Sequence, residues 1–121
     1  MKKFPILSKI KSLNDRITPI PVLVLNPVSS TDLTTYNLTN SLENKSFVFM
    51  SCGTWGNINA TAFMTIGEFK RANSSSQYVE LTTNVAYQTS KQAVKVNYSS
   101  DTAIQISCEN ASQLQFRMWA M

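Results

Sequence analysis

Apolar and polar positions alternate along most of the chain after residue 19, with the period of two that is typical of half-buried strands. The pattern is clearest in the segments 92–98, 102–108 and 113–121, which are separated by short polar turns. Each segment has one apolar and one polar face, so we expect an antiparallel meander with one buried face. The apolar face is formed by Val94, Val96, Tyr98, Ile104, Ile106, Cys108, Leu114, Phe116 and Met118.

Further short strands are expected upstream, at 21–25, 46–52 and 77–82, and the segment 58–71 reads as two strands or one strand with a bulge near Gly67. Residues 28–45 are polar and read as a long connection with at most one edge strand. The total is seven or eight short strands, spaced about 8–12 residues apart, and no helical spacing is sustained after residue 19. The sequence therefore predicts an all-β fold, an antiparallel β-sandwich that is jelly-roll-like.

The first 18 residues differ from the rest in their spacing. Ile6, Ile10, Leu13 and Ile17 recur at intervals of four, three and four residues, which places them on one side of a short helix. The sequence Thr18-Pro19-Ile20-Pro21 then forbids helix and favours extended backbone. We therefore divide the chain into a basic N-terminal arm, residues 1–18, helical or extended, and a β-sandwich domain, residues 19–121.

Charge is also concentrated in this arm. The whole chain has a formal net charge of +4, from 11 basic and 7 acidic residues. The arm carries this excess, so the rest of the chain is neutral and has no broad basic face for nucleic acid. We interpret the arm as an assembly device; contact with phosphate or an acidic partner, and a merely solvated terminus, are the alternatives. Its basic residues are Lys2, Lys3, Lys9, Lys11 and Arg16.

Several classes of chemistry lack the residues that they need. The chain has no histidine, which is the commonest general base and metal ligand, and no phosphate-binding glycine loop. Cys52 and Cys108 are too few for a metal site, and we expect buried thiols or a disulfide. We expect no enzyme, no cofactor and no metal. No apolar run is long enough to span a membrane, and Pro5 interrupts the short apolar start, so no export signal is expected.

Aromatic residues in polar surroundings are the candidate ligand or interface residues. Trp55 lies in a glycine-flanked turn, where it either packs locally or contacts a ligand, and Tyr36 and Tyr87 lie in polar connections. Trp119 is out of phase with its buried neighbours and points to an interface or a second packed face. Arg117 shares its side of the strand, and Trp, Tyr and Arg are enriched at interfaces. Rings beside amides and hydroxyls are equally suited to stacking on sugars.

Two segments resemble a known group of proteins. The stretch AVKVNYSSDTAIQISCENASQLQFRMWAM (residues 93–121) resembles the ends of tail-fibre and receptor-binding proteins of tailed bacteriophages, and FVFMSCGTWGNINATAFM (residues 47–64) is similar to the opening strands of their β-sandwich modules. The likeness covers residues 46–121 and rests on composition and strand rhythm. It implies a virion component, built as a homo-oligomer with a trimer favoured, that contacts other virion proteins and, through its loops, a cell-surface glycan.

The function expected from the sequence is therefore a non-enzymatic structural or adhesive virion subunit, a phage tail or fibre component. Such a subunit would be made in the host cytoplasm and end in the virion, with no nucleic acid as partner and no insertion in a membrane. The alternative is a stand-alone carbohydrate-binding module. Low charge fits both, because charged residues make up only 15% of the chain, whereas Ser, Thr, Asn and Gln make up 44 of its 121 residues.

Overall fold

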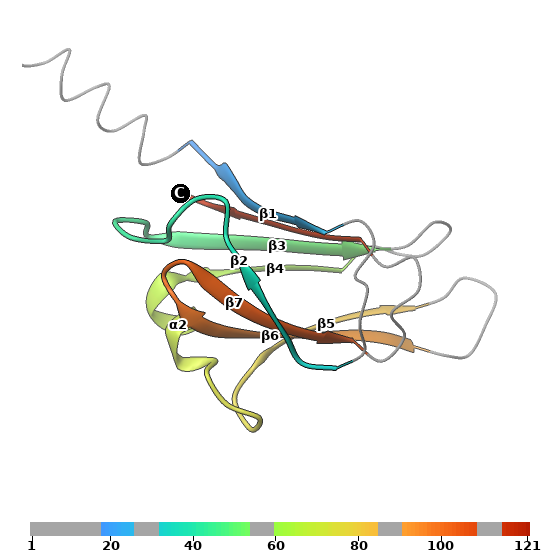
Figure 1. The fold of residues 1–121 in the computed structure, drawn as a ribbon. Coiled ribbons are helices and arrows are strands. Elements are labelled where there is room, and N and C mark those ends of the chain that lie inside the picture. The colour runs from blue at the N-terminus through green and yellow to red at the C-terminus, as the bar shows by residue number, and fades with distance from the viewer. Residues whose placement is uncertain (1–17, 26–31, 54–59, 85–90, 109–114) are drawn as a thin grey trace, which may run out of the picture.

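The fold is known from a computed structural model that describes residues 18–25, 32–53, 60–84, 91–108 and 115–121. These residues form two four-stranded antiparallel sheets packed face to face (Figure 1). Sheet one has the order β1-β8-β3-β4, and sheet two has the order β2-β7-β6-β5. The strands are β1 (Ile20–Leu25), β2 (Thr34–Asn37), β3 (Phe47–Gly53), β4 (Ala60–Thr65), β5 (Val79–Asn84), β6 (Lys91–Ser100), β7 (Ala103–Cys108) and β8 (Gln115–Ala120). The predicted all-β sandwich is confirmed.

The chain winds between the two sheets. The first and last strands, β1 and β8, pair in sheet one, and the next two inward, β2 and β7, pair in sheet two. This wrapping of one end of the chain around the other is the jelly-roll element of the fold. The other pairings described here, apart from that of β3 with β8, join consecutive strands: β3 and β4 form a hairpin in sheet one, and β5, β6 and β7 form a meander in sheet two.

The core lies between the sheets and consists of the inward-facing positions of the alternating strands. Ile104, Ile106, Phe116 and Met118 are fully buried, and Val96 faces Ile106 across the β6–β7 pair. Strands β7 and β8 therefore have the polarity expected from their sequence, with alternate residues inside. Burying a large apolar side chain contributes about 1.5–3 kcal/mol, so this layer is the main source of stability.

One prediction about secondary structure was wrong. The second half of the segment 58–71 is not a strand but the short helix α2 (Ile66–Arg71), which connects β4 in sheet one to β5 in sheet two. The Thr65 hydroxyl caps the helix by accepting a hydrogen bond from the Glu68 backbone N–H at 3.1 Å. Ile66 and Phe69 are its buried residues, and Phe69 packs edge-on against Tyr98 of β6. Six residues are too few for a helical period to appear in the sequence.

The contribution of the core to the free energy of unfolding can be tested with substitutions at two neighbouring residues of β8. We expect Phe116→Ala to lower the free energy of unfolding by about 3–5 kcal/mol, because it leaves a cavity between the sheets. Arg117→Ala, one residue along on the outer side, should change it by no more than about 0.5 kcal/mol. Urea unfolding measures both, and equal effects of the two substitutions would contradict this placement of the core.

Candidate functional site

Two outward-facing surfaces of the sandwich, one on each sheet, are candidates for function. The outer side of sheet one is aromatic. Phe49 on β3 is in register with Trp119 on β8 and with Phe63 on β4, and Trp119 is in register with Pro21 on β1. Residues in direct register lie on the same side of a sheet. A single row of apolar side chains therefore crosses all four strands.

Phe47 lies next to this row on β3. We call the surface formed by Pro21, Phe47, Phe49, Phe63 and Trp119 the aromatic face. The rings of Phe47 and Phe63 are stacked at 5.4 Å, and those of Phe49 and Trp119 are tilted at the same distance. Phe63 is 56% exposed, and Phe47 and Phe49 are each 36% exposed. A shallow pocket opens among these rings, and Pro19 and Met121 also line it.

Trp119 and Arg117, two residues that the sequence singled out, both lie on this outer side of sheet one. Trp119 is half-buried among the rings, and Arg117 is exposed and in register with Val24, which is 55% exposed. The expectation that the Trp119 side chain points away from the core is therefore met.

The three phenylalanines that surround Trp119, namely Phe47, Phe49 and Phe63, were not predicted as interface residues from the sequence. Their signal was present, because the run FVFM is apolar at both alternating positions, which is typical of a strand that is covered on both sides.

The outer side of sheet two is polar and carries a groove of about 230 Å³. Its floor is formed by the two central strands: Lys95 on β6 is in register with Ser107 on β7, and Asn97 with Gln105. One wall is Leu33, which precedes β2. The other wall is Tyr78 together with residues 73–75 of the loop between α2 and β5.

Asn97 holds this second wall in place. It is the buried polar residue of the described part of the chain, at 7% exposure, although it lies on an outer side. Its side-chain amide donates to the Ser74 carbonyl oxygen at 2.8 Å and to the Gln77 carbonyl oxygen at 3.3 Å. Ser74 and Gln77 also exchange two backbone hydrogen bonds with each other. These hydrogen bonds tie the second wall of the groove to its floor.

The charge of the groove comes from Lys95. Its Nζ lies over the Tyr78 ring, 4.7 Å from the ring centre, in a cation–π contact. Glu80 is in register with Lys95 across the β5–β6 pair, but the two do not form an ion pair; Lys70–Asp101 is the ion pair found among the described residues. The lining residues that the structure describes include no Asp or Glu.

Of the remaining residues predicted from the sequence, Tyr36 is the one that the structure describes. Tyr36 is in register with Ile104 and packs against the core, so its ring is not the exposed platform that its polar neighbours suggested. Its hydroxyl is buried without a hydrogen-bond partner among the described residues. Trp55, Tyr87 and the basic residues of the arm, Lys2, Lys3, Lys9, Lys11 and Arg16, lie outside the described residues.

Cys52 and Cys108 are buried thiols and are not joined in a disulfide. Burial raises the pKa of the Cys52 thiol to about 11, and burial also raises the pKa of Cys108. Both thiols are therefore protonated at neutral pH, whereas a nucleophilic cysteine needs the opposite shift.

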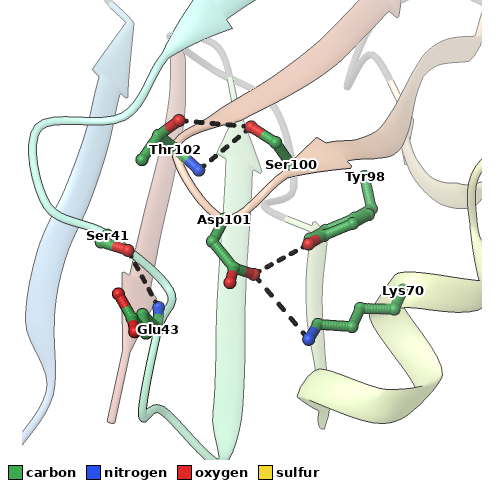
Figure 2. Close-up of polar contacts among 7 residues, drawn as sticks. All are labelled: Ser41, Glu43, Lys70, Tyr98, Ser100, Asp101 and Thr102. Atoms are coloured by element: carbon green, nitrogen blue, oxygen red, sulfur yellow. Dashed lines mark hydrogen bonds and ion pairs between the residues drawn. The ribbon is translucent and has the colours of Figure 1, made fainter.

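The most prominent polar cluster joins α2 to the turn between β6 and β7 (Figure 2). The Tyr98 hydroxyl donates to Asp101 Oδ1 at 2.8 Å, and Lys70 Nζ lies 3.8 Å from the same oxygen. Burial raises the pKa of Tyr98, and its hydrogen bond to Asp101 and the charge of Asp101 raise it further. Since Asp101 is already held by two neighbours, we interpret the cluster as a structural link that closes this end of the sandwich.

Comparison with known proteins found no match to this chain among protein-family models, curated proteins or solved structures. Within the described ranges, no three His, Cys, Asp or Glu residues are grouped as metal ligands. None of the helices in that part of the chain is long and apolar enough to cross a membrane.

Because Asn97 holds the loop that forms the second wall, its substitution should destabilise the protein. Asn97→Ala leaves the Ser74 and Gln77 carbonyl groups without their side-chain partner, and we expect it to lower the free energy of unfolding by about 1–3 kcal/mol. Amide hydrogen exchange in residues 73–78 should also become faster. The matched control is Asn37→Ala on the exposed edge of β2, which should do neither. Unchanged exchange in the 73–78 loop of the Asn97 variant would refute this role.

Proposed function

We propose that this protein is a non-enzymatic structural subunit that assembles into a larger particle through the aromatic face. The observation that carries the proposal is the row of Pro21, Trp119, Phe49 and Phe63 across the outer side of sheet one. Soluble monomers rarely expose large contiguous apolar surfaces, and such surfaces usually mark sites of interaction with other molecules.

The composition of the face favours a protein partner. Aromatic side chains dominate the energetics of protein–protein interfaces, and arginine is enriched there with them. The aromatic face supplies four rings within one surface, with Arg117 on the same side of the sheet. The rings already contact one another in two pairs, so they lose little conformational freedom when a partner covers them. A second copy of the chain is the simplest partner, and the resemblance to phage fibre modules favours a trimer.

The particle that we propose is a bacteriophage virion, in which the chain is a tail or fibre component beside other virion proteins. This part rests on the likeness of residues 46–121 in composition and strand rhythm. The N-terminal arm would be the second contact, since its apolar stripe at Ile6, Ile10, Leu13 and Ile17 needs a partner surface to become stably ordered.

The groove on sheet two favours a second candidate function, carbohydrate binding, either alone or as the adhesive task of the virion subunit. Sugar sites combine an aromatic ring with neutral hydrogen-bonding side chains, and the groove is lined by Tyr78, Gln105 and Ser107. The residues that would bind a sugar are thus different from the predicted Trp55, Tyr36 and Tyr87.

Assembly through the aromatic face can be tested by light scattering. We expect the native chain to have a mass that is a multiple of its single-chain 13.5 kDa. The double variant Phe49→Ser with Phe63→Ser should return it to the single-chain mass, because the centre of the contact is lost. Leu33→Ser removes a comparably exposed apolar side chain from the other sheet and should leave the mass unchanged. A native chain that is monomeric at all concentrations would contradict self-assembly.

The contribution of the arm can be tested with charge-matched variants of the full chain. Ile10→Asp with Leu13→Asp places two acids in the apolar stripe, whereas Ser8→Asp with Ser12→Asp places the same two charges on the opposite side of the predicted helix. We expect the first pair to abolish incorporation into the assembly and the second to retain it. Equal incorporation of both variants would show that the stripe is not a contact surface.

A further inference from the structure

The charge and the lining of the groove on sheet two indicate which class of sugar it would bind. This inference rests on the second candidate function, carbohydrate binding. We propose that the groove binds a sugar residue that carries a carboxylate, of the uronic or sialic acid type, with the carboxylate at Lys95.

The floor defines where such a ligand would lie. Lys95 and Ser107 face each other in one row of the sheet, and Gln105 lies in the adjacent row beside Asn97. The floor thus carries an amine, a hydroxyl and an amide on two central, hydrogen-bonded strands, with the Lys95 Nζ placed over Tyr78. Neighbouring strands lie about 4.8 Å apart and alternate residues of one strand about 6.8 Å apart, so a ligand of the size of one sugar ring would reach more than one of these residues. The groove volume of about 230 Å³ is below that of typical drug-sized pockets, which also fits a single ring.

The walls supply the apolar contacts that a sugar ring needs. Leu33 is 57% exposed on one side, and the Tyr78 ring stands on the other. Apart from Lys95, the polar side chains of the groove are neutral amides and hydroxyls. The side chains of Asn73 and Ser107 have no hydrogen-bond partner among the described residues, so their polar groups are available to ligand hydroxyls.

The arrangement of charge is what selects an acidic ligand. Among the described residues that line the groove, Lys95 is the only charged one, and its Nζ is held over Tyr78 and not against Glu80. The exposed Glu80 in the next strand lies just outside the lining and opposes an anion at Lys95. We therefore expect binding to be weak, and we expect removal of the Glu80 charge to strengthen it.

The test is a nuclear magnetic resonance titration of the full-length native chain with glucuronate, and with glucose and acetate as matched controls. Glucuronate and glucose share a ring and differ in the carboxylate, whereas acetate is a carboxylate without a ring. We expect glucuronate to shift the backbone amide signals of Lys95, Gln105 and Ser107, with much smaller shifts from glucose and acetate.

Variants then assign the contacts. Lys95→Gln should weaken glucuronate binding about tenfold, because a charged hydrogen bond is lost, and Glu80→Gln should strengthen it. Lys70→Gln, which removes the same charge from α2 outside the groove lining, should leave it unchanged. Loss of binding in Lys95→Gln with a native-like spectrum would support the carboxylate contact, since misfolding is then excluded.

The outcomes separate the two levels of the proposal. Equal shifts with glucose would overturn the acidic ligand but retain carbohydrate binding in the groove. Equal shifts with acetate would mean an adventitious ion only, and no shift with any of the three would overturn both the ligand and the carbohydrate-binding function at this groove.

Discussion

The hydrophobic contact between the inner faces of the two sheets is the interaction on which the rest of the molecule depends. It is formed by alternate residues of each strand, of which Val96, Ile106 and Phe116 are typical. Because the period of a strand is two, burial of this set also determines which side chains point outward. The aromatic face is formed by outward residues of sheet one, and the floor of the polar groove is formed by outward residues of sheet two.

The two outer sides are physically opposite in kind. Sheet one carries the aromatic row on its outer side, next to a polar row of Arg117, Ser51 and Thr61, whereas the outer side of sheet two is polar, as expected for a sheet that faces water. The chain therefore has a natural orientation in an assembly: sheet one would lie against a neighbour, and sheet two would remain accessible. The assembly and the binding that we propose use different surfaces and do not exclude each other.

Much of the fold could be predicted from the sequence, because the strands of the last third alternate cleanly. Helix α2 could not, since six residues show no helical period, although the spacing of Thr65 and Glu68 matches a helix-capping motif. The candidate sites were predicted less well. Trp119 and Arg117 stand out by their phase within one strand, but the aromatic face is created by register between β1, β8, β3 and β4. The groove likewise requires the loop at Ser74 to lie against Asn97, 23 residues further along the chain, and no local pattern contains that contact.

In the assembly that we propose, another protein chain covers the aromatic face. Hydroxyl-radical footprinting of the native chain, read out residue by residue by mass spectrometry, measures this directly. We predict that labelling of Phe49, Phe63 and Trp119 falls as protein concentration rises, whereas labelling of Leu33, which precedes β2 of the other sheet, stays constant. Labelling of the three rings that is equal at every concentration, and as strong as that of Leu33, would contradict it.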